Sequence, residues 1–203
     1  LEVSGDGVLG AMDVRADAAT FEAFGLERLR SWACNRNARW RADGTVSVTE
    51  AMRADSGSTA VLDAPVRVDR SFELAFDTFL YFTSGRPADG WSLFFQKAGS
   101  GACGGGNTGY SGVADSFGVV VDVYNEQVLF GVNGTAAQTF PTRGVLTTHG
   151  VWTARRRCRL VYDAAARRVT FSIRTPDGVE AAWDYAVDLA SVVGTDAAYL
   201  TLG

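Results

Sequence analysis

The sequence has little of the chemistry on which many enzymes and metal proteins depend, because only one of its 203 residues is histidine and three are cysteine. None of Cys34, Cys103 and Cys158 belongs to a C-x-x-C pair, so the spacing of a zinc or redox site is absent. His149 has no acid and nucleophile pattern near it, and a catalytic triad therefore has no support. These absences argue against the commonest cysteine-based and histidine-based sites.

The sequence also lacks long apolar runs and concentrated positive charge. No apolar run reaches the roughly 18 residues that cross a bilayer, so direct membrane insertion is not expected. Residues 1–6 have neither the basic start nor the apolar core of a signal peptide, as in a cytosolic protein or a mature, processed one. The formal net charge is -4, and the arginines are spread along the chain. Nucleic acid is a poor candidate partner, because phosphate binding needs a concentrated basic surface.

Hydrophobic residues make up 47% of the sequence, enough for the core of one domain, and they occur in short alternating segments. Residues 71–79 are the clearest case, with Phe72, Leu74, Phe76 and Thr78 on one face. Such segments, separated by Gly, Asp, Ser and Pro, predict an all-β fold, an antiparallel sandwich or barrel. Further strands are expected at residues 44–49, 60–62, 66–68, 128–132, 159–162 and 168–174.

Helices are expected in only two places. Residues 21–29 are compatible with a short helix, and residues 189–194 with a single turn that ends on glycine. Residues 155–159 instead alternate arginines with Cys158, which indicates a strand with one solvated face. The inward position of Cys158 in this alternation predicts a buried free thiol.

Three polar points lie at the ends of predicted strands, and such points can meet at one rim of a sheet. Asp89, in an Ala-Asp-Gly sequence, fits either a turn or an acceptor that holds two neighbouring hydroxyls of a sugar ring. Residues 98–107 form a glycine-rich loop before Gly109, typical either of a flexible surface loop or of backbone N–H groups that approach a ligand. Residues 122–126 carry carboxylate, carbonyl and amide oxygens, which calcium prefers, beside an aromatic ring on which a sugar can stack.

Taken in order, these segments resemble the L-type (legume-like) lectins over nearly the whole chain. Residues 87–96 are similar to that family's Ala-Asp-Gly motif and the apolar strand after it. Residues 109–112 are similar to its GYxG turn, and residues 119–125 to its VEFDxYxN strand. Residues 71–79 resemble its SFxxxFxF strand. Further matches in the same order lie at residues 21–24, 37–46, 150–163 and 187–189.

The resemblance implies a concanavalin A-like antiparallel β-sandwich of the jelly-roll type, with residues 1–203 as one L-type lectin-like domain. It implies a carbohydrate-binding protein rather than an enzyme, with a glycan bound at the rim of a concave sheet above a calcium ion (Ca2+). Glycans or glycoproteins are then the expected partners, and assembly with other protein domains is compatible with the fold. The expected location is secreted, the cell surface or the secretory-pathway lumen. There Asn133-Gly134-Thr135 would be a meaningful glycosylation pattern, and Cys34 and Cys103 could pair.

Carried over residue by residue, the resemblance assigns roles at this rim. Asp89 would accept hydrogen bonds from sugar hydroxyls, and Gly109 would donate its backbone N–H. Tyr124 would stack on the sugar ring, and Asn125 would bridge sugar and calcium. The expected metal ligands are Asp122, the Tyr124 carbonyl, Asn125 and, as a substitute, Glu126.

The sequence also departs from the family pattern. Val120 stands where the family has an acidic residue, and Asn125 follows Tyr124 directly where the family usually has one residue between them. The strand at residues 128–132 then begins at once, without the further aspartate and histidine ligands of many members. The sequence ends at residues 199–203, where the family continues into a last strand, so an incomplete C-terminal edge is expected.

These departures leave two other functions open. One is a degenerate lectin-fold module, structural or for protein interaction, that binds neither sugar nor calcium. The other is a jelly-roll glycoside hydrolase, which needs two carboxylates about 5 to 10 Å apart. Asp122 and Glu126 are the available pair, but Val120 stands where the nucleophile of an ExDxxE pattern is expected, and the enzyme is disfavoured.

Overall fold

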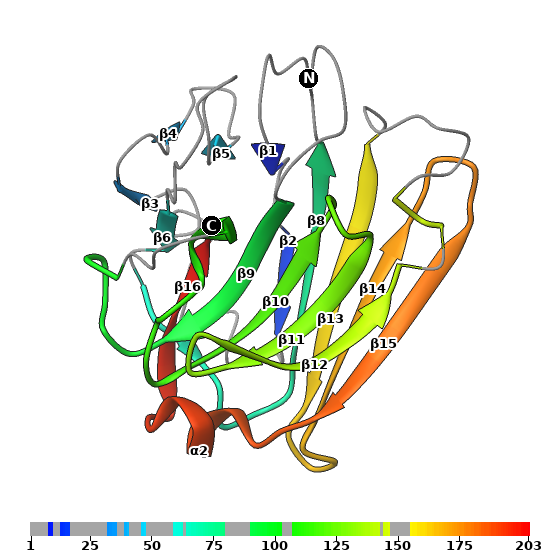
Figure 1. Cartoon of the computed structure of the whole chain (residues 1–203). Coiled ribbons are helices and arrows are strands. Elements are labelled where there is room, and N and C mark those ends of the chain that lie inside the picture. The colour runs from blue at the N-terminus through cyan, green and yellow to red at the C-terminus, as the bar shows by residue number, and fades with distance from the viewer. Residues whose placement is uncertain are drawn as a thin grey trace.

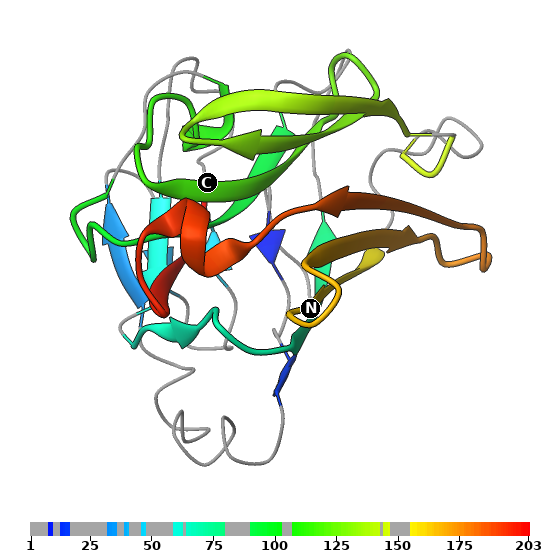
Figure 2. The same ribbon diagram turned by 90° about the horizontal axis from the view of Figure 1, so that it is seen from below.

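The computed structural model describes two antiparallel β-sheets stacked as a sandwich (Figure 1, Figure 2). It describes residues 8–9, 13–16, 32–35, 39–40, 46–47, 59–62, 64–79, 90–102, 107–142, 144–146 and 155–203, of which only the backbone is described up to residue 47. Every strand pair within these ranges is antiparallel. The predicted all-β antiparallel sandwich is therefore confirmed.

The first sheet has the strand order β15-β14-β13-β8-β1-β5-β4, and β2 also pairs with β8. Its long strands are neighbours over most of their length, so Cys158 on β13 lies between Phe76 on β8 and Ile173 on β14. The strands are β1 (Val8–Leu9), β2 (Asp13–Ala16), β4 (Arg39–Trp40), β5 (Val46–Ser47), β8 (Phe72–Phe79), β13 (Arg156–Asp163), β14 (Arg168–Arg174) and β15 (Glu180–Ala186).

The second sheet has the order β12-β11-β10-β9-β16-β6-β3, and β7 also pairs with β16. The last strand of the sequence, β16, therefore lies inside this sheet, between β9 and β6, and is not an edge strand. A further strand beyond Gly203 stays a prediction. The strands are β3 (Trp32–Asn35), β6 (Thr59–Leu62), β7 (Val66–Arg67), β9 (Gly90–Gln96), β10 (Ser116–Asp122), β11 (Gln127–Val132), β12 (Thr135–Pro141) and β16 (Ala197–Leu202).

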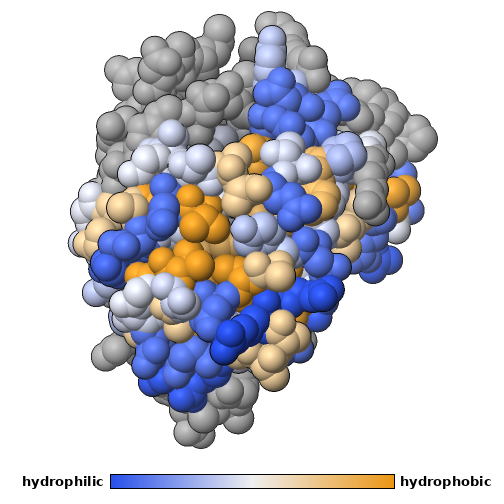
Figure 3. All heavy atoms as spheres, turned by 60° about the horizontal axis from the view of Figure 1, so that its bottom comes forward, coloured by the Kyte–Doolittle hydropathy of each residue, from blue (hydrophilic) through white to orange (hydrophobic). Residues whose placement is uncertain are grey.

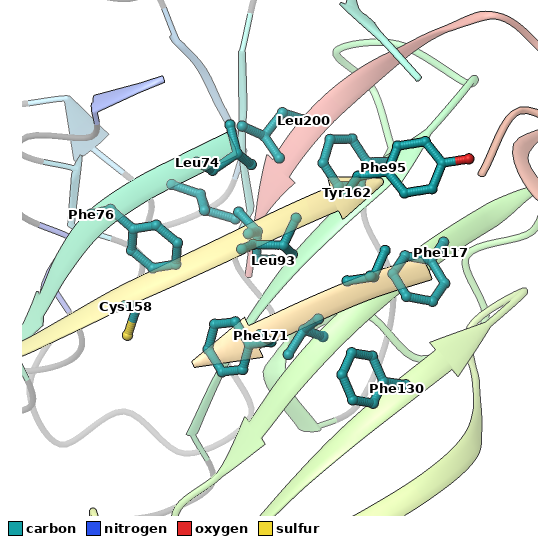
Figure 4. Packing of buried hydrophobic residues seen from close by; sticks show 14 of the residues in the cluster. Leu74, Phe76, Leu93, Phe95, Phe117, Phe130, Cys158, Tyr162, Phe171 and Leu200 are labelled. Carbon is teal, nitrogen blue, oxygen red and sulfur yellow. The ribbon is translucent and has the colours of Figure 1, made fainter. Parts of the chain in front are cut away.

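The core lies between the two sheets and is rich in aromatic side chains (Figure 4). On β8, Phe72, Leu74 and Phe76 are all buried, as their alternation predicts. Phe72 meets Phe95 of β9 at 5.3 Å between ring centroids, and Phe76 meets Trp91 edge-on at 5.7 Å. Burying one such side chain stabilises a protein by roughly 1.5–3 kcal/mol, so these contacts between the sheets are a main source of stability.

The predicted short helix at residues 189–194 is confirmed as α2 (Leu189–Val193). It ends at Gly194, the glycine at which the sequence predicts its end. The Asp188 side chain caps the start by accepting the Ser191 N–H at 3.1 Å. Gly194 has φ of 71°, a left-handed conformation, and its N–H donates to the Ala190 carbonyl at 2.9 Å. The predicted helix at residues 21–29 lies outside the described residues.

Most predicted strands are present, and β12 and β15 are among the strands that were not predicted. The segments expected from residue 60 onward correspond to β6, β7, β8, β11, β13 and β14, and β5 lies inside the segment at residues 44–49. β12 gives no signal because nearly all of it is exposed and it has no alternation of burial. The inward positions of β15 are Ala181, Trp183 and Tyr185, but its alanine-rich sequence leaves few large apolar side chains to reveal the strand.

Cys158 is a buried free thiol, as predicted. Desolvation raises its pKa to about 12, although Thr78 Oγ1 lies 3.7 Å from its sulfur. On the outer face of β13, Arg157 and Arg159 are exposed and reach Asp77 and Glu73 on β8. The side chain of Cys34 and the whole of Cys103 lie outside the described residues, so their pairing stays a prediction.

No helix among the described residues is long and apolar enough to span a membrane. Figure 3 looks toward the end of the sandwich where α2 lies. On this face hydrophobic residues gather in a band with hydrophilic residues around them.

Candidate functional site

One end of the second sheet brings together the start of β9, the end of β10 and the start of β11. Gly90 is the cross-strand partner of Asp122, and Asp122 is in turn the partner of Gln127. Residues 123–126 form the turn between β10 and β11. We call Gly90 together with residues 122–127 the Asp122 rim.

Gly90 can only be glycine at this position. Its φ is +146°, and a Cβ added to it would lie 1.9 Å from the Val121 carbonyl oxygen. β9 therefore begins in close contact with the backbone of β10. Asp89, the predicted sugar acceptor, precedes Gly90 in the sequence and lies outside the described residues, so its role stays a prediction.

The Asp122 carboxylate is held by three N–H donors. Oδ1 accepts the backbone N–H of Asn125 at 2.8 Å. Oδ2 accepts the side-chain amides of Asn125 at 2.8 Å and Gln127 at 3.0 Å. Sequence reasoning missed the part of Gln127, because only the pairing of β10 with β11 places it opposite Asp122.

The turn presents an aromatic ring to solvent. Val123 is buried and anchors the turn to the core, whereas Tyr124 is 49% exposed and Asn125 is exposed. Glu126 has φ of 55°, which reverses the chain, and its carbonyl accepts the Thr142 N–H at 2.9 Å. The opposite orientation of Val123 and Tyr124 is as predicted for the end of a strand.

Residues 107–113 lie on the outer face of the same sheet, the face directed away from the core. Ser92 Oγ donates to the Thr108 carbonyl at 2.7 Å, and Ser92 is two residues along β9 from Gly90. Gly109, the predicted N–H donor, follows in the 3₁₀ turn η1 (Asn107–Gly109) and is buried. The loop that carries Gly109 therefore lies on the outer face near the Asp122 rim.

Tyr110 covers the middle of this outer face. Its ring is 5.2 Å from that of Phe94, and its hydroxyl accepts the Ser116 hydroxyl at 3.4 Å. It rests on Gly118 and Gly131, where an added Cβ would lie 2.9 Å and 2.3 Å from the ring. Burial raises the pKa of Tyr110, so the phenol stays neutral. The sequence shows both glycines, but only the pairing of β10 with β11 places them side by side.

A buried arginine holds the segment that follows β12. Arg156, 5% exposed, donates from Nε to the Val145 carbonyl at 2.7 Å and from Nη2 to the Leu146 carbonyl at 2.8 Å. Burial lowers the pKa of Arg156. The ordinary pKa of arginine is so high that the guanidinium still keeps its charge. The segment it holds continues from Thr142, which bonds to Glu126. This contact could not be predicted from the sequence, because the alternation of β13 indicates only that residue 156 faces inward.

No family model and no curated protein matches the sequence, but solved structures match the fold. A lectin from Bauhinia forficata in complex with GalNAc has a TM-score of 0.72 at 17% identity, over 95% of this chain and 90% of that one. Lectin I from Ulex europaeus, in complex with the methyl glycoside of α-L-fucose, has a TM-score of 0.71 at 16% identity, over 98% and 90%. Arcelin-5, a lectin-like defence protein from Phaseolus vulgaris, has a TM-score of 0.70 at 14% identity, over 95% and 87%.

The chain has the legume-lectin fold.

The predicted concanavalin A-like sandwich is thus confirmed, and the predicted site residues divide into groups within it. Asp122 and Asn125 are in direct contact, and Tyr124 projects beside them. Gly109 lies on the same sheet face, on the side of β9. Among the described residues, the predicted site residues of the turn therefore lie together, and Gly109 lies apart from them on the same sheet face.

The Asp122 rim does not fit a calcium ion, which takes about six to eight oxygen ligands. A carboxylate can only accept hydrogen bonds, so the amides of Asn125 and Gln127 must point their nitrogens, not their oxygens, at Asp122. Within the described ranges, no three His, Cys, Asp or Glu side chains are grouped so that they could hold a metal. The calcium site expected from Asp122, Tyr124, Asn125 and Glu126 stays a prediction that these contacts do not support.

Proposed function

We propose that the chain is a carbohydrate-binding domain that recognises a glycan at the Asp122 rim. The observation that carries the proposal is the Tyr124 ring, half exposed in the turn that also carries the polar side chains of Asp122 and Asn125. A folded protein gains by burying such a ring, whereas a sugar-binding site uses it to stack on the apolar face of a pyranose. The sugar complexes of the two similar lectins support this choice of ligand class.

Asn125 of the rim, together with Asp89 and Gly109 outside it, supplies directional contacts in this proposal. The Asn125 amide nitrogen is engaged by Asp122, which leaves its carbonyl oxygen turned away from the carboxylate and suited to accept a sugar hydroxyl. Asp89, next to Gly90 in the sequence, would accept two hydroxyls, and Gly109 would donate its N–H. A glycosidase of the ExDxxE pattern would need a carboxylate at position 120, but Val120 stands there and is the cross-strand partner of Leu129.

A glycan array followed by calorimetric titration of the best ligand tests the proposal. Wild-type binding that is lost in Asp89→Ala and weakened at least tenfold in Tyr124→Ala is the expected result. Asp184→Ala and Val179→Ala are matched controls, since both residues are exposed outside the rim and should bind as wild type. A wild-type protein that binds nothing on the array would overturn the function. Full binding by both Asp89→Ala and Tyr124→Ala would overturn the site.

The second candidate is a lectin-fold interaction module that binds neither sugar nor calcium. The internal hydrogen bonds of Asp122 favour it, because the turn is complete without any ligand. Arcelin-5 has the same fold and is described as lectin-like. An empty glycan array with a cooperatively folded protein is the result that this candidate predicts.

A further inference from the structure

The Asp122 rim is organised around a negative charge rather than a positive one. Asp122 accepts three hydrogen bonds, at 2.8, 2.8 and 3.0 Å, from one backbone amide and two side-chain amides. A cation site has the reverse arrangement, with oxygens directed at the ion. An ion bound to Asp122 would need the side-chain oxygens of Asn125 and Gln127 directed at it. Their nitrogens are directed at the Asp122 carboxylate instead.

The same contacts fix the conformation of the turn. Asp122 and Gln127 are the last cross-strand pair of β10 and β11, so their side chains meet on the outer face of the sheet. Asn125 is tied to Asp122 by both its backbone and its side chain. On the other side, the Glu126 carbonyl accepts the Thr142 N–H. The tip that carries Tyr124 is therefore held from both strands and from the segment after β12.

We infer that Asp122, Asn125 and Gln127 form a hydrogen-bonded clamp that positions the rim turn without calcium. Asp122 is a positioning residue here, and Gln127 is the side chain that supplies a donor where a metal site needs an oxygen. That the clamp positions Tyr124 for a glycan rests on the proposed function. That the clamp holds the turn without calcium does not.

Thermal unfolding of the whole chain in excess EDTA and in excess calcium chloride tests the clamp directly. A ligand that binds only the native state must raise Tm, so equal Tm values in the two solutions are expected. If calcium raises Tm and Asp122→Asn abolishes the rise, the ion binds at this turn and the inference is overturned. A rise that Asp122→Asn leaves intact puts the ion elsewhere and supports the cation-free turn.

A gain-of-function variant makes the test sharper. Gln127→Glu replaces a donor by a second carboxylate against Asp122, which should lower Tm in EDTA through repulsion and restore it in calcium chloride. Gln138→Glu, at an exposed position on β12, is the matched control and should respond to neither solution. Equal Tm of Gln127→Glu and wild type in EDTA would overturn the clamp, because Gln127 would then hold nothing in place.

The outcome is separable from that of the proposed function. If the protein binds no glycan but its Tm is indifferent to calcium, the clamp stands and the lectin proposal falls. Suppose instead that glycan binds, that EDTA abolishes its affinity and lowers Tm, and that EDTA no longer lowers Tm in Asp122→Asn. The lectin proposal then stands and the clamp falls.

Discussion

Tyr110 lies against Gly131 so closely that a Cβ added to the glycine would be 2.3 Å from Cε1 of the ring. Gly131 is the cross-strand partner of Gly118, which meets the other edge of the same ring. The neighbouring strands β10 and β11 thus both carry glycine at this cross-strand pair. The ring of Tyr110, from the loop before β10, fills the space that two side chains would otherwise take. This contact joins the outer face of the sheet to the loop that carries Gly109.

Gly131→Ala should destabilise the protein by about 1–3 kcal/mol, because the methyl group overpacks the Tyr110 contact. Denaturant unfolding measures the change. Gly101→Ala is the matched control, since a Cβ there meets nothing within 4 Å. Equal stability of the two variants would mean that Tyr110 moves aside without cost.

Gly90→Ala should be more damaging, by about 2 kcal/mol or more, because the backbone at φ of +146° is strained for any other residue and the Cβ meets a carbonyl oxygen. If glycan binds at the Asp122 rim, affinity should fall as well, since the start of β9 must shift. Unfolding and titration on the same preparation separate the two effects. Unchanged stability would contradict the close contact with Val121.

Arg156→Met should destabilise the protein because it leaves the Val145 and Leu146 carbonyls without their donor, at about 1–3 kcal/mol for each buried acceptor. Arg155→Met is the control on the adjacent position, where the guanidinium is half exposed and lies 3.7 Å from Asp77. That change should stay within about 1 kcal/mol. Hydrogen exchange should locate the loss of protection of Arg156→Met around Thr142 and the rim turn.

The buried thiol predicts a dependence of stability on alkaline pH. The folded-state pKa of Cys158 is about 12 against an ordinary thiol value of 9.0, so the unfolded chain loses this proton first. The contribution is intact below pH 9 and is lost as the pH rises from about 9 to 12. Cys158→Val removes this titration, and the wild type should lose stability relative to the variant as pH rises through this range. Denaturant unfolding at several pH values measures the difference, and parallel curves would contradict the raised pKa.

The sequence pattern was sufficient to predict burial and element ends wherever these depend only on the residue's own strand or helix. The alternation of Phe72, Leu74 and Phe76 predicted which face of β8 is buried, and the position of Gly194 predicted the end of α2. β12 escaped prediction because an exposed edge strand has no buried face to leave a pattern.

The site was only partly predictable. The sequence indicated that Asp122, Tyr124 and Asn125 act together, because they lie within one turn. It assigned them to calcium through the resemblance, whereas the contacts direct two amide nitrogens at the carboxylate. Gln127 belongs to this cluster only because the hairpin register sets it opposite Asp122.

The sequence by itself determined an all-β antiparallel fold, since side-chain alternation is a local property that each strand carries along its length. The lectin type came from the resemblance of its motifs to that family. Only the tertiary structure decided that Tyr110 rests on Gly118 and Gly131, that Arg156 donates to the Val145 and Leu146 carbonyls, and that Asp122 is held by amides. Such contacts join residues whose neighbourhood depends on strand order and register. A shift of one residue in register would send every side chain to the opposite face, and the local pattern alone does not fix which strands meet.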